Sequence, residues 1–333
     1  MDLASRRPGP DVTRALAMAG VIVMNYHGYS ILRGAPRGDN ILDPWTGPFS
    51  TRFAATFVVT AGIGVTLMAD RAGRSRRTDI SWRIASRGVL LYSFGMAFDL
   101  FWPGTILPFY GAMFVLAAGM IWLRSRWIIA IGIAAALGAW LLRWWRYERD
   151  QDGFSTAWLT DPPTNIRGLI IDVFVNGTHP VLPWLAFFCA GLVLGRLMDR
   201  RHWIPITAAV GFVLFAIATT VEAVTPDTLP ARLVLSVDPF DRGIFYTASA
   251  LGTALLAVAL ITAIAERFET SAAIDSLRRA GQLSLTVYIA HAVVFEVVVD
   301  QLELVGIESV VEAIVVAVVG GGPTANTICR VLA

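Results

Sequence analysis

The chain has 333 residues, of which 56% are hydrophobic and 16% charged, and its mean hydropathy is +0.62. A soluble domain carries about 25% charged residues, so this composition excludes an ordinary soluble globular domain. The net charge of +2 comes with arginines in short loops instead of one basic patch, so it does not indicate a nucleic-acid partner. We expect an integral membrane protein surrounded by lipids.

Hydropathy predicts an all-α, polytopic bundle of about ten transmembrane helices that forms a single domain over residues 1–333. Each apolar run has the length of roughly 20 residues that a bilayer core demands. The expected spans are 11–31, 50–70, 83–102, 105–123, 126–144, 181–199, 203–223, 243–266, 282–302 and 309–322.

Basic loops predict the orientation of this bundle. Residues 71–83 carry five arginines between the second and third spans, so this loop is expected in the cytoplasm. Counting the spans alternately places both termini in the cytoplasm as well. The longer connections at 145–180 and 224–242 are then extracytoplasmic loops.

The first span, from Asp11 to Gly28, carries the most informative polar residues. It opens with Asp11 and Arg14 and ends on Asn25, Tyr26 and His27. Arg14 and His27 are separated by 13 positions, or about 20 Å of helix. Because ionisable residues within a membrane segment are costly, both ends of this helix are functional candidates.

Three of the four histidines are expected at or near membrane depth, and the fourth, His202, is expected in a solvated loop. His27 and His179 fall at outer helix ends, and His291 lies within the ninth span. Each can be a general base or only a hydrogen-bonding residue between helices. Asp99, Asp172, Glu296 and Asp300 are candidate carboxylate partners, and the sequence does not tell which of them pairs with which histidine.

No metal cofactor is expected. The histidines lack the i, i+4 spacing of a helical zinc motif. The two cysteines, Cys189 and Cys329, offer neither a thiolate site nor a disulfide framework.

Several segments, in order along nearly the whole chain, resemble two families of membrane proteins. Asp11, Arg14 and Asn25 are placed as in the first helix of YeiB-type bacterial proteins, and Asn25-Tyr26 is similar to the same helix in heparan-α-glucosaminide N-acetyltransferases. The segments FAATFVVTAGIGVTL, RGVLLYSFGMAFDLFWPGTILPFYG, HPVLPWLAFFCAGLVLGR and GQLSLTVYIAH resemble later helices of these families. Both belong to the transmembrane acyltransferase superfamily.

In the large O-acyltransferase branch of this superfamily, a histidine lies eleven positions after the arginine. In this sequence that position is Asn25, and His27 comes two residues later. A shift of two residues turns a helical side chain by about 200°.

The resemblance implies an acyltransferase of the bacterial inner membrane, with both termini inside. It would move an acyl group, such as acetyl, from cytoplasmic acyl-CoA to a hydroxyl or amine of an extracytoplasmic glycan or lipid. Arg14, Arg83 and Arg87 would hold the CoA phosphates through charge-assisted hydrogen bonds.

The same resemblance implies the catalytic residues. His27 or His291 would act as the general base or accept the acyl group transiently, and Asn25 or Tyr26 would donate to the oxyanion.

Two other functions fit the same sequence. In a transporter, His291, Glu296 and Asp300 would form a proton or substrate relay. A non-catalytic subunit would only organise a membrane complex. The sequence leaves the oligomeric state open.

Overall fold

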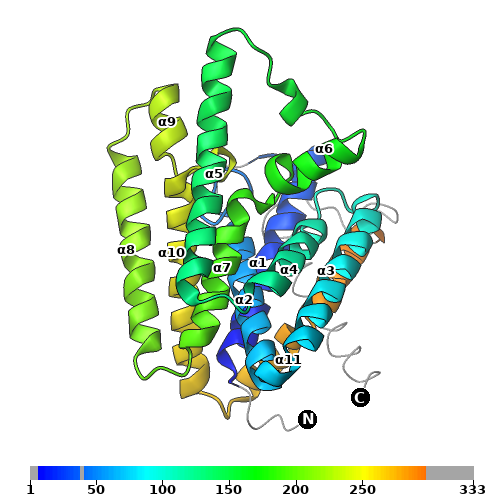
Figure 1. Cartoon of the computed structure of the whole chain (residues 1–333), viewed down its shortest axis with the longest axis vertical. Coiled ribbons are helices and arrows are strands. Elements are labelled where there is room, and N and C mark those ends of the chain that lie inside the picture. The colour runs from blue at the N-terminus through cyan, green and yellow to red at the C-terminus, as the bar shows by residue number, and fades with distance from the viewer. Residues whose placement is uncertain (1–6, 38–40, 298–333) are drawn as a thin grey trace. The chain divides into compact units, whose positions relative to one another are not determined.

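The computed structural model describes residues 7–37 and 41–297 (Figure 1). Within these residues all regular structure is helical and no strand occurs, which confirms the expected all-α class. The α-helices are α1 Gly9–Leu32, α2 Arg52–Ala72, α3 Arg77–Asp99, α4 Leu107–Met120, α5 Ser125–Gln151, α6 Ile166–Ile171, α7 Val181–Leu197, α8 Trp203–Ala223, α9 Leu229–Leu235, α10 Ile244–Arg267, α11 Ala272–Gln282 and α12 Ser284–Val294.

Five of these helices, α1, α2, α5, α8 and α10, are long and apolar enough to cross a membrane. Two bent pairs raise the number to seven if each pair is one span: α6 to Asn176 with α7, bent by 55°, and α11 with the segment from Ser284 to Val297, bent by 79°. The expected number of ten spans therefore stays a prediction.

Two of the expected spans differ from the others in the structure. Helix α4 has 14 residues, or about 21 Å, which is shorter than a bilayer core of about 30 Å. Helix α3 is long enough, but its first half carries Arg83 and Arg87, which lower its hydropathy. The last expected span, 309–322, and the end of the ninth lie outside the described residues.

The two connections expected as outer loops contain helical structure. Helix α5 continues to Gln151, and α6 and the π-helical turn η4 (Asp172–Asn176) follow within 145–180. The side chain of Asn165 caps α6 by accepting a hydrogen bond of 2.9 Å from the Gly168 amide. Helix α9 lies within 224–242 and has a proline in its first turn, where no amide donor is needed.

The chain divides into two compact units. We call the described residues of 1–57 and 254–333 the terminal unit, and residues 58–253 the central unit. The terminal unit holds α1, α11 and α12, and the boundaries between the units fall inside α2 and α10.

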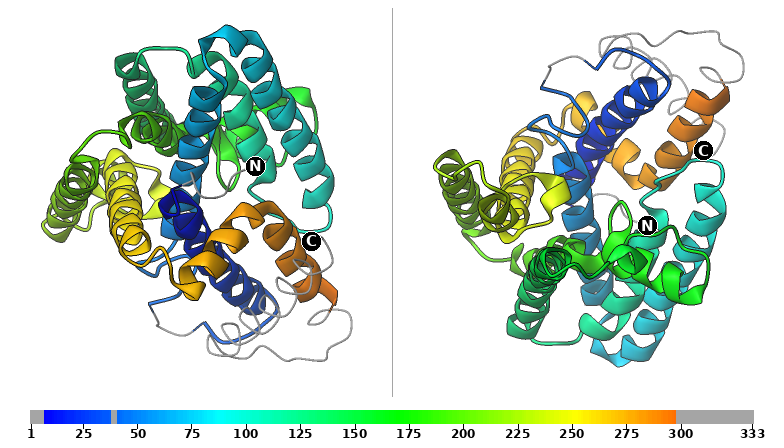
Figure 2. Two further views of the ribbon diagram at one scale, coloured as in Figure 1. Left: turned by 90° about the horizontal axis from the view of Figure 1, so that it is seen from below. Right: turned by 90° about the horizontal axis from the view of Figure 1, so that it is seen from above.

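In the terminal unit, α1 packs against α11 and α12, and Figure 2 shows these helices side by side. Gly281 of α11 lies directly against α1, since an added Cβ would be 2.7 Å from the carbonyl carbon of Asp11. Val12, Ala265 and Ile274 form a buried apolar cluster nearby. A glycine thus allows the backbones of α1 and α11 to meet.

In the central unit, glycines lie at several close helix contacts. A Cβ at Gly88 of α3 would lie 2.8 Å from the Val115 amide of α4, and one at Gly252 of α10 would lie 2.7 Å from the Phe215 amide of α8. Figure 1 shows α3 beside α4. Small residues at helix contacts are the usual packing device inside a membrane, where apolar side chains gain little by leaving lipid.

Helix α8 supports the membrane assignment most directly. Only 17% of its apolar window is buried, and Phe212, Ile206 and Ile217 are each more than half exposed. Monomeric soluble proteins rarely expose contiguous apolar faces of this kind. A lipid environment covers such a face at no cost.

Candidate functional site

The end of α1 carries three of the four residues expected to be catalytic. Asn25, Tyr26 and His27 occupy successive positions of a helix that continues to Leu32. Successive residues of an α-helix differ by about 100°, so Asn25 and His27 point to different neighbours. All four expected catalytic residues belong to the terminal unit, where they form two groups, one of which joins α1 to α12.

The first group consists of Asn25, Tyr26 and His291. The amide nitrogen of Asn25 lies 3.1 Å from Nε2 of His291, and the Tyr26 hydroxyl donates a 2.8 Å hydrogen bond to the backbone carbonyl of His291. The Tyr26 ring stacks on the imidazole with 5.9 Å between centroids. Two residues of α1 thus hold one residue of α12.

The hydrogen bond to Asn25 defines the protonation of His291. An amide nitrogen can only donate, so Nε2 of His291 accepts, and the neutral ring carries its proton on Nδ1. Backbone carbonyl groups of Tyr288 and Val287 also interact with the ring. The lone pair of this imidazole is therefore already in use.

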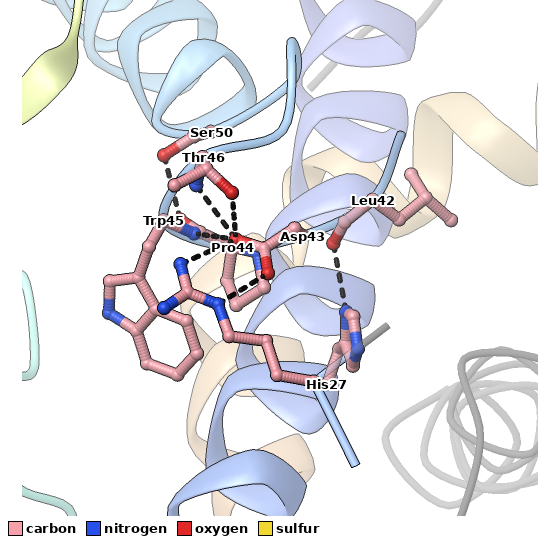
Figure 3. Close-up of polar contacts among 8 residues, drawn as sticks. His27, Leu42, Asp43, Pro44, Trp45, Thr46 and Ser50 are labelled. Carbon is pink, nitrogen blue, oxygen red and sulfur yellow. Dashed lines mark hydrogen bonds and ion pairs between the residues drawn. The ribbon is translucent and has the colours of Figure 1, made fainter. Parts of the chain in front are cut away.

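The second group contains His27 and the segment that follows α1 (Figure 3). His27 is buried, and its Nδ1 lies 2.9 Å from the backbone carbonyl of Leu42. A carbonyl can only accept, so Nδ1 carries a proton and donates it. In the neutral ring this leaves the lone pair on Nε2, the nitrogen that does not face Leu42.

The segment from Ile41 to Ser50 is folded around the carboxylate of Asp43. Asp43 is buried and accepts hydrogen bonds from the Trp45 amide at 2.9 Å and from the Thr46 amide at 2.7 Å. Arg37 donates from Nε at 2.9 Å. Burial by itself would raise the pKa of the Asp43 carboxyl, but these hydrogen bonds outweigh it and hold the pKa well below its usual range.

Two of the expected carboxylate partners, Glu296 and Asp99, contact groups other than the histidines. Glu296 forms an ion pair of 3.1 Å with Arg33, and Asp300 lies outside the described residues. Asp99 accepts a hydrogen bond from the Gly104 amide in the central unit. The acceptor that His27 contacts is a backbone carbonyl, which no residue type in the sequence reveals.

The three arginines expected to bind CoA phosphates are divided between the units. Arg14 is half-buried on α1, in the same unit as the histidines. Arg83 and Arg87 are exposed on α3 in the central unit. Their role in binding stays a prediction.

His179 belongs to the central unit, where its ring meets Trp184 edge-on with 4.6 Å between centroids. Its Nδ1 lies 3.1 Å from the Thr178 hydroxyl. Nearby, Arg242 donates to the backbone carbonyls of residues 175–177, and burial lowers the pKa of its guanidinium to about 10. The contacts of His179 with Trp184 and Thr178 are those of a residue that packs within the central unit.

The sequence did not indicate Asp43, Arg37 or Leu42 as site residues, since they lie in the connection between the first two expected spans. The four residues Asp43-Pro44-Trp45-Thr46 carry a usable signal. An aspartate before a proline favours a turn in which the carboxylate accepts from the next amides along the chain.

Among the described residues, no group of three or more potential metal ligands occurs.

Residues 152–324, slightly more than half of the chain, match the protein family described as an acyltransferase domain. The chain belongs to this family. No curated protein matches the chain. The matched region of this acyltransferase-family protein includes His291, whereas Asn25, Tyr26 and His27 precede it. Family membership and the apolar helices together support a membrane acyltransferase in general terms, without naming its donor or its acceptor.

Proposed function

We propose that this protein is a bacterial inner-membrane acyltransferase that moves an acyl group, most simply acetyl, from cytoplasmic acyl-CoA to a hydroxyl or amine of an extracytoplasmic glycan or lipid. Membership of the acyltransferase family supports the reaction class. The observation that carries the proposal is the hydrogen bond from His27 Nδ1 to the Leu42 carbonyl. It fixes an imidazole with a basic Nε2 in a buried position at the end of α1.

In the proposed reaction, His27 is the general base. Nε2 takes the proton from the acceptor hydroxyl or amine as that group attacks the thioester carbonyl carbon. The tetrahedral intermediate then expels the CoA sulfur, which receives the same proton from the imidazolium and leaves as the free thiol. The Leu42 carbonyl keeps its hydrogen bond to Nδ1–H throughout and stabilises the imidazolium.

Burial of His27 suits this chemistry. Exclusion of water strengthens the electrostatic interactions of the imidazole and protects the thioester from hydrolysis. Arg14, about 20 Å away along α1, would contact the CoA phosphates near the cytoplasmic end, with Arg83 and Arg87 as further candidates.

His291 receives a different role in this proposal. Its lone pair accepts from Asn25, and the Tyr26 hydroxyl is used by a backbone carbonyl, so this group fastens α12 to α1. Asn25 points to a different neighbour than His27, so in this proposal it belongs to the structural group and does not serve the oxyanion.

The test is release of CoA thiol by purified protein in lipid nanodiscs, with acetyl-CoA and longer acyl-CoAs, alone and with glucosamine as a hydroxyl and amine acceptor. We expect His27→Ala to lower turnover by about 10²–10⁴-fold. His202→Ala serves as the matched control, because His202 is exposed next to α8 in the central unit.

Full turnover by His27→Ala, with loss in a folded His291→Ala protein, would transfer the role of base to His291. Transport of a solute without release of CoA thiol would show that the protein is a transporter and not an acyltransferase.

A further inference from the structure

The carboxylate of Asp43 organises a turn immediately beside the contact of His27. Its Oδ1 accepts from the Trp45 amide, the Thr46 amide and the Thr46 hydroxyl, the last at 3.0 Å. Its Oδ2 accepts from Arg37 Nε, and the Arg37 guanidinium also lies over the Trp45 ring at 5.2 Å. Both oxygens of one buried carboxylate thus accept hydrogen bonds from the connection between α1 and α2, through Arg37, Trp45 and Thr46.

The turn is also closed through its backbone. The Gly47 amide donates a 3.0 Å hydrogen bond to the Asp43 carbonyl, and the Ser50 hydroxyl donates 2.7 Å to the Pro44 carbonyl. A Cβ at Gly47 would lie 2.6 Å from the Asp43 carbonyl oxygen, so only glycine fits there. These contacts fix the backbone at Asp43.

The atom that meets His27 belongs to the peptide group that joins Leu42 to Asp43. The contacts of the turn hold Asp43 by its carboxylate and its carbonyl, and the Leu42 carbonyl belongs to the planar peptide group bonded directly to the Asp43 Cα. That carbonyl accepts from Nδ1 of His27 at 2.9 Å. The turn and the imidazole are therefore coupled through one rigid peptide plane.

We propose that Asp43, clasped by Arg37, is a positioning residue that aims the Leu42 carbonyl at His27 and so selects the Nδ1–H tautomer of the imidazole. Asp43 acts through the backbone and touches no substrate. The tautomer follows from the contacts alone, whereas its effect on turnover rests on the proposed function of His27 as a general base.

The experiment uses full-length protein with ¹⁵N-labelled histidine in nanodiscs. The His27 ring resonances are assigned from the spectrum of His27→Ala, and their shifts report which ring nitrogen is protonated. In the wild type at pH 8 we expect Nδ1 protonated and Nε2 bare. In Asp43→Ala we expect a mixture of the two tautomers, because the carbonyl is no longer held in place.

Turnover is measured on the same samples as acetyl-CoA consumption. Asp43→Ala is expected to lower kcat by about tenfold to a hundredfold with little change in KM for acetyl-CoA, the usual size of an effect on a residue that orients a catalytic group. Asp43→Asn, which keeps an oxygen for the Trp45 and Thr46 amides, is expected to restore part of the Nδ1–H signal. Asp227→Ala is the control, because Asp227 is a highly exposed carboxylate of the central unit, 3.9 Å from Arg232.

The outcomes separate this inference from the proposed function. An unchanged Nδ1–H tautomer in a folded Asp43→Ala protein overturns the positioning role, even if the wild type is an active acyltransferase. A wild type without any turnover, combined with a tautomer that responds to Asp43→Ala, refutes the proposed function and leaves the positioning role intact.

Discussion

His27 and His291 are both buried, lie in the same unit and carry the proton on Nδ1, yet their surroundings use opposite sides of the ring. At His291 the hydrogen bond from Asn25 occupies the lone pair of Nε2. At His27 the hydrogen bond to Leu42 engages the N–H of Nδ1. A base needs its lone pair, so equal burial and an equal tautomer still produce different chemistry.

The two histidines also differ in what holds them. His291 is fastened by side chains of α1, a regular helix, through Asn25 and Tyr26. His27 is held by an irregular turn built around one carboxylate, Asp43. Packing between helices thus supports one imidazole, and a hydrogen-bonded loop positions the other.

The largest effect is expected from a substitution that removes the lone pair of His27 Nε2 but keeps a hydrogen-bond donor to Leu42. In His27→Gln the side-chain amide can still donate to Leu42, but it has no basic nitrogen. We expect loss of about 10²–10⁴-fold in turnover, measured as CoA-thiol release, with little change in Tm. Wild-type turnover in this variant would mean that the base lies elsewhere.

A second substitution targets the close contact of α11 with the start of α1, in the same unit as His291. Gly281→Val places a branched side chain against the Asp11 backbone of α1, and overpacking of this kind costs about 1–3 kcal/mol or more. We expect a lower Tm in detergent. Gly119→Ala is the control, since nothing lies within 4 Å of an added Cβ at that position. An equal Tm for Gly281→Val and the wild type would contradict the close contact of α11 with α1.

Removal of one hydroxyl tests whether the His291 group is structural. Tyr26→Phe removes the donor to the buried His291 carbonyl, which is expected to lower the stability by about 1–3 kcal/mol. Turnover per folded protein should stay within a few-fold of the wild type. Tyr147→Phe on α5 is the matched control. A large loss of kcat without a loss of stability would assign Tyr26 a catalytic role instead.

The smallest expected effect is a pH dependence of thermal stability, which comes from Asp43 in the turn that contacts His27. The folded protein holds the pKa of Asp43 below the unfolded value of about 3.9, so its contribution to stability is complete above that pH and is lost as the pH falls below it. The difference in Tm between the wild type and Asp43→Asn, expected to be about 2–4 °C, should be constant from pH 8 to 5 and shrink toward pH 3. A difference that grows on acidification would contradict the lowered pKa.

Several helices follow directly from the pattern of apolar residues. The expected spans 11–31, 203–223 and 243–266 correspond closely to α1, α8 and α10. Their bounds are predictable because long apolar runs end at charged residues, glycines and prolines, which are local signals. The span expected at 105–123 is present as α4 but is shorter than expected, and the helices within 145–180 and 224–242 were not predicted. Hydropathy alone does not measure helix length or capping.

The sequence by itself identified Asn25, Tyr26, His27 and His291 as the residues to consider, and helix geometry alone required Asn25 and His27 to diverge by about 200°. Only the tertiary structure decided their partners. Asn25 and His291 are 266 positions apart, and the acceptor of His27 is a backbone carbonyl, a group that every residue possesses. Local patterns encode helices because each turn depends on neighbouring residues, whereas the chemistry of a buried imidazole depends on which distant atom the fold brings to each ring nitrogen.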